Sequence, residues 1–180
     1  MMGRIYHRDY VNKELGKVRS YLMKKKDWYT LITLVIMGII FFFSGQPGEE
    51  SSQISGKFAQ WIASIPVLGT AVTEMTEVVP LRKMAHMFSY FILAISMNLT
   101  VGEWVRTLKG FDFTGLSSGK REWLIAFVAI FLCFLYACSD EFHQTFVAGR
   151  VGCMTDVGID MIGSLVGTVV IALVRKPSIG

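Results

Sequence analysis

The sequence has few cysteines, prolines and charged residues: three cysteines, four prolines and 18% charged residues in 180 positions. Cys133, Cys138 and Cys153 form no Cys-x-x-Cys pair, so neither a disulfide framework nor a zinc ribbon is supported. No His-Glu-x-x-His metalloprotease motif and no internal repeat occur. The net charge of +4 is modest, and we predict no nucleic-acid partner.

Apolar residues, in contrast, are abundant, at 52% of the chain, and aromatic residues make up 13%. They concentrate in four runs, at residues 28–43, 84–99, 123–138 and 157–174. The first three runs are slightly shorter than the roughly 20 residues that a spanning helix needs. Because four such runs are each bounded by charge, we predict an all-α integral membrane bundle of four transmembrane helices in contact with the lipid bilayer.

The distribution of basic residues predicts the orientation of these spans. If the N-terminus is cytoplasmic, the inner segments hold 14 of the 18 lysine and arginine residues. We therefore predict a multi-pass protein of the cell membrane with both termini cytoplasmic. The organisation would be a basic cytoplasmic N-terminal arm (1–27), a membrane domain (28–176) and a short C-terminal tail (177–180). The first run is followed by no small-x-small cleavage site, which favours an uncleaved anchor.

Two patterns concern helix packing. Between the first two runs, the apolar residues Ile54, Phe58, Trp61, Ile62 and Ile65 recur at helical spacing, which predicts an amphipathic helix in the outer interface.

In the last run, Gly163 and Gly167 have the Gly-x-x-x-Gly spacing that allows a second helix to approach closely. That second helix can belong to the same chain or to a partner, so both intramolecular packing and an oligomer remain open.

Polar residues gather at the predicted outer ends of all four runs. They are Gln46 after the first run, Arg82, Lys83, His86 and Tyr90 in the second, Asp140, Glu141, His143 and Gln144 after the third, and Arg150, Asp156 and Asp160 around the start of the fourth. Asp140, His143 and Gln144 share a face if the third helix continues past Cys138, and His86 and Tyr90 share one on the second. Asp160 is about one turn inside the hydrocarbon edge, so it requires a partner such as Arg150, Arg82, Lys83 or a histidine.

Three segments carry a family resemblance: "FSGQPGEESS" at 43–52, "RKMAHMFSYFIL" at 82–93 and "SDEFHQTFVAGRVGCMTDVGIDMIGSLVG" at 139–167. In this order they resemble the VanZ-like family of small membrane proteins, named for a teicoplanin-resistance protein, over about residues 30–175. Ala148 departs from the family pattern, in which we expect proline. The resemblance implies a role at the cell envelope and tolerance of teicoplanin or related lipid-tailed glycopeptides.

Three functions are compatible with the polar cluster. In the first, an enzyme acts on a lipid-linked or anionic headgroup: His143 or His86 is the base or nucleophile, and Asp140 or Glu141 orients it. The substrate-binding groups would be Arg150, Arg82, Lys83, Gln144, Asp156, Asp160, Gln46 and Tyr90, with the arginines holding phosphate.

The second function is non-catalytic capture of such a headgroup, or of a lipid-tailed glycopeptide. The third is a structural subunit of a membrane assembly, packed through Gly163 and Gly167. Carboxylate and imidazole groups also suit zinc or manganese, but Arg150 opposes a cation, so we predict no cofactor and keep a divalent metal as the minor alternative.

Overall fold

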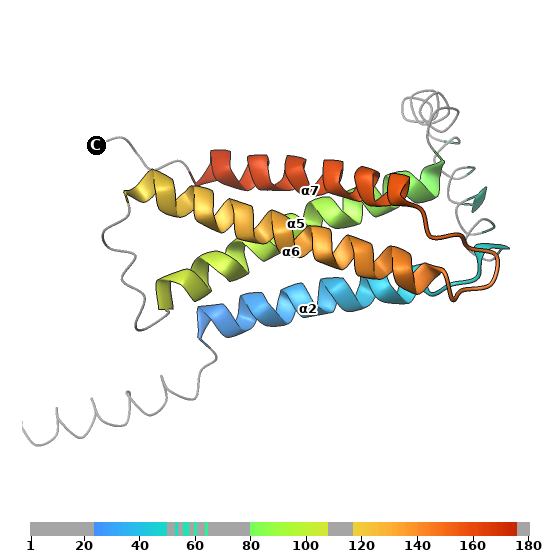
Figure 1. The fold of residues 1–180 in the computed structure, drawn as a ribbon, viewed down its shortest axis with the longest axis horizontal. Helices are drawn as coiled ribbons and strands as arrows, with labels where there is room; N and C mark the ends of the chain where they lie inside the picture. The colour runs from blue at the N-terminus through green and yellow to red at the C-terminus, as the bar shows by residue number, and fades with distance from the viewer. Residues whose placement is uncertain are drawn as a thin grey trace, which may run out of the picture.

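The structure, a computed structural model, describes residues 24–49, 53, 56–57, 60, 64, 80–107 and 117–175. Within these residues the chain forms four α-helices and no strand (Figure 1). The helices are α2 (Lys25–Ser44), α5 (Leu81–Thr107), α6 (Ser118–Gln144) and α7 (Met154–Val174). Each is long and apolar enough to cross a membrane. The predicted all-α bundle of four transmembrane helices is confirmed.

The helices are longer than the apolar runs from which they were predicted. Both α5 and α6 contain 27 residues, which corresponds to about 40 Å at 1.5 Å per residue. Residues 101–107 and 118–122, which lie between the second and third apolar runs, are helical. The apolar composition marks the part of each helix that lies in hydrocarbon, whereas the backbone hydrogen bonds continue into polar sequence beyond it.

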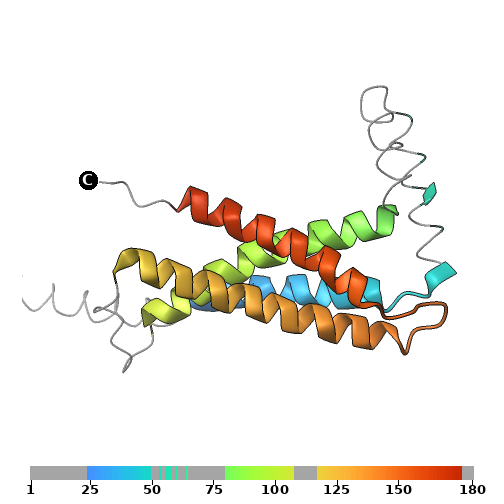
Figure 2. The same ribbon diagram turned by 45° about the horizontal axis from the view of Figure 1, so that its top comes forward.

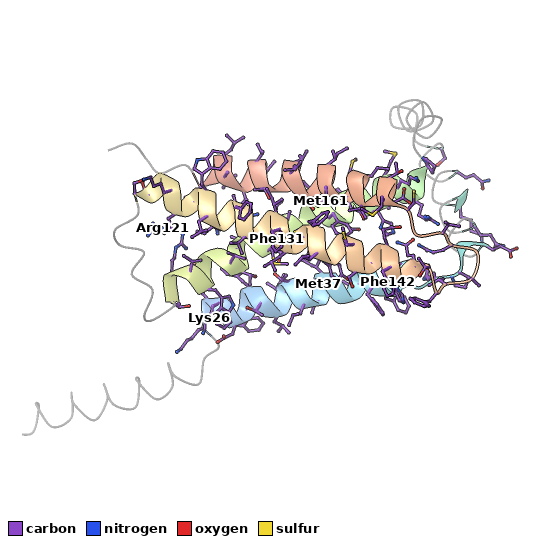
Figure 3. The ribbon with its side chains drawn as sticks, viewed as in Figure 1. Lys26, Met37, Arg121, Phe131, Phe142 and Met161 are labelled. Atoms are coloured by element: carbon purple, nitrogen blue, oxygen red, sulfur yellow. The ribbon has the colours of Figure 1, made fainter. Side chains whose placement is uncertain are left out.

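The helices alternate in direction, so that four helix ends meet at one end of the bundle (Figures 1 and 2). The ends of α2 and α6 and the starts of α5 and α7 lie there, and we call this end of the bundle the polar end. α5 contacts the other three helices, and α7 packs mainly on α5 and α6. Figure 3 shows Lys26 and Arg121 at the opposite end and Phe142 at the polar end.

Many large apolar side chains of the bundle face outward, and small and polar ones are common inside, as expected in lipid. Phe127, Phe131 and Ile162 are exposed, whereas Ala129 and Cys133 are fully buried. Hydrogen bonds between hydroxyl and amide side chains connect the helices at mid-depth. Thr33 Oγ1 bonds to Ser96 Oγ at 2.6 Å and Thr100 Oγ1 at 2.8 Å, and Asn98 Nδ2 donates to Thr168 Oγ1 at 3.0 Å.

Gly163 and Gly167 make an internal helix contact. A Cβ atom at Gly163 would overlap the carbonyl oxygen of Met87, and one at Gly167 would overlap that of Phe91. The two glycines thus bring the backbones of α5 and α7 together. The second helix that these two glycines accommodate is therefore α5 of the same chain, and an oligomer stays a prediction.

Several predicted segments lie outside the described residues. These are most of the basic arm at 1–27, most of the predicted interfacial helix at 54–65 and the tail at 177–180.

Candidate functional site at the polar end of the bundle

The polar residues at the end of α6 face the bundle interior because they continue its buried stripe. Ile125, Ala129, Cys133 and Ala137 follow one another at four-residue spacing, and all are buried. Asp140, Glu141 and Gln144 come next on the same face and are also buried. Because α6 continues helically to Gln144, these side chains reach the region where the other three helix ends meet.

Asp140 lies within a set of hydrogen bonds that joins α6 to α2. Ser44 Oγ donates to Asp140 Oδ2 at 2.8 Å, and Gln144 Nε2 contacts the same oxygen at 3.3 Å. Gln144 Nε2 also donates to Glu141 Oε1 at 3.0 Å. The second oxygen, Asp140 Oδ1, is buried and has no hydrogen-bond partner within the described residues. Asp140 is therefore fixed through one oxygen only.

His86 lies between two buried carboxylates. Its Nδ1 atom is 4.0 Å from Asp140 Oδ2 and 3.9 Å from Asp160 Oδ1. Both distances exceed that of a hydrogen bond. Asp160 is only 1% exposed, and neither of its oxygens has a hydrogen-bond partner in the described part of the chain. Tyr90, one turn after His86 on α5, is fully buried, and its hydroxyl group also has no hydrogen-bond partner among the described residues.

A pocket opens beside His86 between α5, α6 and α7. It is lined by Arg82, Lys83, His86, Glu141, Gln144, Asp156, Ile159 and Asp160, and its volume is about 10 Å³, close to the space that one water molecule needs. Lys83 Nζ forms a salt bridge with Asp156 Oδ1. Arg82 forms no salt bridge to any described residue, so it is the cation available to a ligand.

Arg150 connects the loop between α6 and α7 to the end of α2. Its Nε atom donates to the Gln46 carbonyl at 2.7 Å and its Nη2 atom to the Phe43 carbonyl at 3.1 Å, while Nη1 donates to Gln144 Oε1 at 3.2 Å. Burial and the neighbouring Arg82 guanidinium lower the pKa of Arg150, and Asp140 and Glu141 oppose this shift. The arginine predicted to bind phosphate thus donates all three nitrogens to the protein itself.

Close backbone approaches fix the same loop. The Gly48 amide donates to the Ala148 carbonyl at 3.1 Å, and Gly149 adopts a left-handed φ of 72°. Position 148 contributes its carbonyl group, which proline would also supply, so the departure from the family pattern leaves this contact intact. The Cys153 amide donates to Glu141 Oε2 at 2.8 Å, which brings the start of α7 against α6.

A family model for VanZ/LLP1 proteins matches residues 29–175. The chain belongs to the VanZ/LLP1 family. This match includes all four described helices apart from the first four residues of α2 and includes the loop that carries Arg150. No curated protein and no solved structure matches this chain.

In this VanZ/LLP1 protein, His143 occupies a different position from the other predicted site residues. Its ring stacks on Phe41 at a centroid distance of 4.1 Å and is not part of the pocket lining. Gln46 contributes its backbone carbonyl. The pocket therefore brings together ten of the predicted residues, directly or through the adjoining hydrogen bonds, and it includes His86 rather than His143. Tyr90 is buried nearby on α5 but belongs to neither group.

Ser44, which donates a hydrogen bond to Asp140, is among the polar residues at the end of the first run but was not predicted to belong to the site. Its signal was available, because Thr33, Ile40 and Ser44 form one helical stripe on α2, and all three are buried. Sequence reasoning also missed a Gly-x-Ser-x-Gly spacing at residues 115–119. Ser117 of that segment directly precedes α6 at the end of the bundle opposite His86, so the spacing is unrelated to the pocket.

No group of three or more histidine, cysteine, aspartate or glutamate side chains is arranged to hold a metal ion among the described residues. Asp140 and Asp160 have unpartnered oxygens, but His86 is the only other such side chain near both of them in the described part of the chain.

Proposed function

We propose that this VanZ/LLP1 protein binds the phosphate-bearing headgroup of an envelope lipid or lipid-linked molecule and acts on it by acid–base chemistry. The observation that supports the proposal is that three buried carboxylate oxygens beside His86, one of Asp140 and both of Asp160, have no hydrogen-bond partner among the described residues. A network that only fixed helix ends would pair its buried acids, because an unpartnered buried polar group is costly. Such costly ionisable groups inside a membrane bundle are typical of functional sites.

The residues around the pocket have distinct proposed roles. Arg82 would hold the phosphate, since a guanidinium group can bond two of its oxygens at once. His86 would transfer the proton, and the carboxylates of Asp140 and Asp160 would stabilise its protonated form. The salt bridge between Lys83 and Asp156 would hold α5 against α7 at the pocket mouth.

This proposal is tested on the purified full-length protein in nanodiscs made from envelope lipid extract. The protein is then transferred from the nanodiscs into detergent, and the lipids that stay bound to it are identified by mass spectrometry. The wild type is compared with Arg82→Gln and His86→Gln, and Arg106→Gln is the control. Arg106 lies near the opposite end and, among the residues that the structure describes, pairs with Glu103. We expect Arg82→Gln to reduce retained phospholipid about tenfold, the equivalent of roughly 1.4 kcal/mol. Equal retention by Arg82→Gln and the control would refute the headgroup site.

Catalysis and capture predict different behaviour for His86→Gln. If His86 transfers a proton, this variant retains lipid but leaves its headgroup unchanged during incubation. If the site only captures its ligand, neither the variant nor the wild type alters the headgroup.

Tolerance of teicoplanin is the envelope phenotype that we propose for the site. Susceptibility is measured in cells that express the wild type, His86→Gln or Arg82→Gln at matched membrane levels. Loss of tolerance in both variants supports chemistry at the pocket, and loss in Arg82→Gln alone supports charge-based capture. A wild type that confers no tolerance would exclude resistance as the function, while the lipid-retention experiment would still decide the headgroup site.

We also propose that the polar end faces outward. Cys153 is exposed at this end, whereas Cys133 is buried. The hydrogen bond with Thr155 lowers the pKa of the Cys153 thiol, which favours its reaction at neutral pH. A membrane-impermeant maleimide should label Cys153 in intact cells and should not label Cys153→Ser. Labelling only after cell lysis would show that the polar end faces the cytoplasm.

A further inference from the structure

An apolar groove lies beside the polar pocket on the surface of the bundle. It is lined by Met87, Phe88, Phe91, Gly163 and Val166 and has a volume of about 260 Å³. All five residues belong to α5 or α7, and none has a polar side chain. The groove is therefore far larger than the pocket and suits only an apolar occupant.

The groove and the pocket are lined by neighbouring residues of the same two helices. On α5, Met87 of the groove directly follows His86 of the pocket. On α7, Gly163 of the groove comes one turn after Asp160 of the pocket. Because Gly163 has no side chain and contacts Met87, the two helices cross closely at this point. A molecule with a polar head and an apolar chain would fit a polar pocket that lies next to an apolar groove.

The surroundings of the site indicate how such a molecule would enter. The loop and helix start beside the pocket expose the apolar side chains of Phe146, Val151 and Met154. On the groove side, Phe88 and Val166 are exposed as well. Exposed apolar residues of this kind lie in lipid or its interface. The route to the pocket that suits an amphiphile is thus lateral, from the membrane between α5 and α7.

We infer that the groove holds one hydrocarbon chain of the same phosphate-bearing lipid whose headgroup Arg82 holds at the mouth of the polar pocket, since the pocket itself has room for about one water molecule. The inference rests on the proposed function, and it adds that the ligand is a membrane amphiphile that enters from the side. Arg82, which forms no salt bridge among the described residues, provides charge complementarity to the phosphate. The neighbouring residues of α5 and α7 that line the two surfaces would place head and chain on one molecule. An ordinary lipid at the bundle surface would occupy the groove without depending on Arg82.

The test uses lysophosphatidylglycerol with a photoactivatable group in its single chain, bound to the full-length protein in dodecyl maltoside micelles, which contain no phosphate. Irradiation attaches the probe, and mass spectrometry locates it. The groove-filling variant is Val166→Trp. Leu165→Trp is its matched control, because Val166 and Leu165 are 50% and 48% exposed but only Val166 lines the groove. Arg82→Gln tests the headgroup.

We expect labelling of the α5 and α7 segments that contain Phe91 and Val166 in the wild type and Leu165→Trp. It should decrease at least about tenfold in Val166→Trp and in Arg82→Gln, the equivalent of roughly 1.4 kcal/mol of binding free energy. Unlabelled lysophosphatidylglycerol should displace the probe, whereas glycerol phosphate, which lacks the chain, and monoacylglycerol, which lacks the phosphate, should not. Val166→Phe provides a smaller filling substitution if the tryptophan variant does not fold.

The two proposals can fail separately. If Arg82→Gln releases the probe but Val166→Trp and Leu165→Trp both retain it, the groove inference is wrong and the headgroup site remains. If Val166→Trp releases the probe and Arg82→Gln retains it, the groove binds chains that are not linked to the pocket. That result would contradict the proposed function as well as the inference that depends on it.

Discussion

Removing the Arg150 side chain should destabilise the whole bundle, because this residue joins three parts of the polar end. It donates to the carbonyl group of Phe43 in the last turn of α2, to that of Gln46 just after the helix, and to the side chain of Gln144 on α6. Hydrogen bonds that involve a charged group contribute roughly 1.5–3 kcal/mol each, and buried acceptors left without a donor add to the loss. Since the three bonds belong to one side chain and are not additive, we expect Arg150→Ala to lower the free energy of unfolding by about 3–5 kcal/mol.

The assay is reversible unfolding of the purified protein in mixed micelles, with rising sodium dodecyl sulfate and helix content as the signal. Arg106→Ala is the matched control, because Arg106 also forms a hydrogen-bonded salt bridge, at 2.9 Å to Glu103, but is 43% exposed in that pair. Exposed pairs contribute about 0–1 kcal/mol. Arg150→Lys keeps the charge but supplies a single donor group, and it should be intermediate between Arg150→Ala and the wild type.

An unchanged unfolding curve for Arg150→Ala, together with a loss of lipid retention, would refute this reasoning. It would show that Arg150 acts on a ligand, as the sequence alone predicted, and that its bonds to the loop are dispensable.

Three further substitutions test the contacts that position the site. Gly163→Ala should separate α5 from α7 and lower the free energy of unfolding by about 2 kcal/mol or more. Gly38→Ala is the control and should be tolerated, because a Cβ at Gly38 meets nothing within 4 Å. Equal unfolding curves for the two variants would exclude the close helix crossing. Gly152→Ala would place a Cβ 2.5 Å from the Glu141 carbonyl oxygen, so we expect a loss of similar size in the same assay. Ser44→Ala removes the shortest hydrogen bond to Asp140 and should cost about 1–3 kcal/mol, and no change would show that Asp140 is held elsewhere.

Much of the fold was predictable because a membrane helix is specified by local composition. The four apolar runs, each bounded by charge, are sufficient to identify four spans and their alternation. The helix ends were less predictable: the run ending at Cys138 belongs to a helix that continues to Gln144. Hydropathy decreases where a helix leaves hydrocarbon, and it carries no information about where the backbone hydrogen bonds stop.

The gathering of the polar residues at one end of the bundle was predictable, but their arrangement there was not. Alternating topology brings the polar helix ends together, and helical spacing puts Asp140 and Gln144 on one face. Which histidine would face the acids depends on helix rotation, and two adjacent residues point in directions about 100° apart. The sequence therefore could not distinguish His143, which stacks on Phe41, from His86. Long-range contacts such as those of Arg150 with residues before position 50 lie beyond any local pattern.

Asp160 provides the sharpest test of whether the polar end is built for stability or for function. Sequence reasoning led us to expect that a charged partner would satisfy it, but its two oxygens have no hydrogen-bond partner among the described residues, and His86 Nδ1 is 3.9 Å away. Asp160→Asn keeps the shape and removes the capacity for a buried charge, so we expect it to raise the free energy of unfolding by about 1–3 kcal/mol. The same variant should lose headgroup chemistry, since His86 would face one carboxylate instead of two.

The unfolding assay and the lipid incubation decide this on one preparation, with Asp156→Asn as the control. Asp156 is paired with Lys83, so its substitution should destabilise the protein. A gain in stability at 160 and a loss at 156 would mean that Asp160 is maintained at a stability cost, which is typical of functional residues. A loss of stability in both variants would assign both aspartates to the structure and remove the main support for a catalytic site.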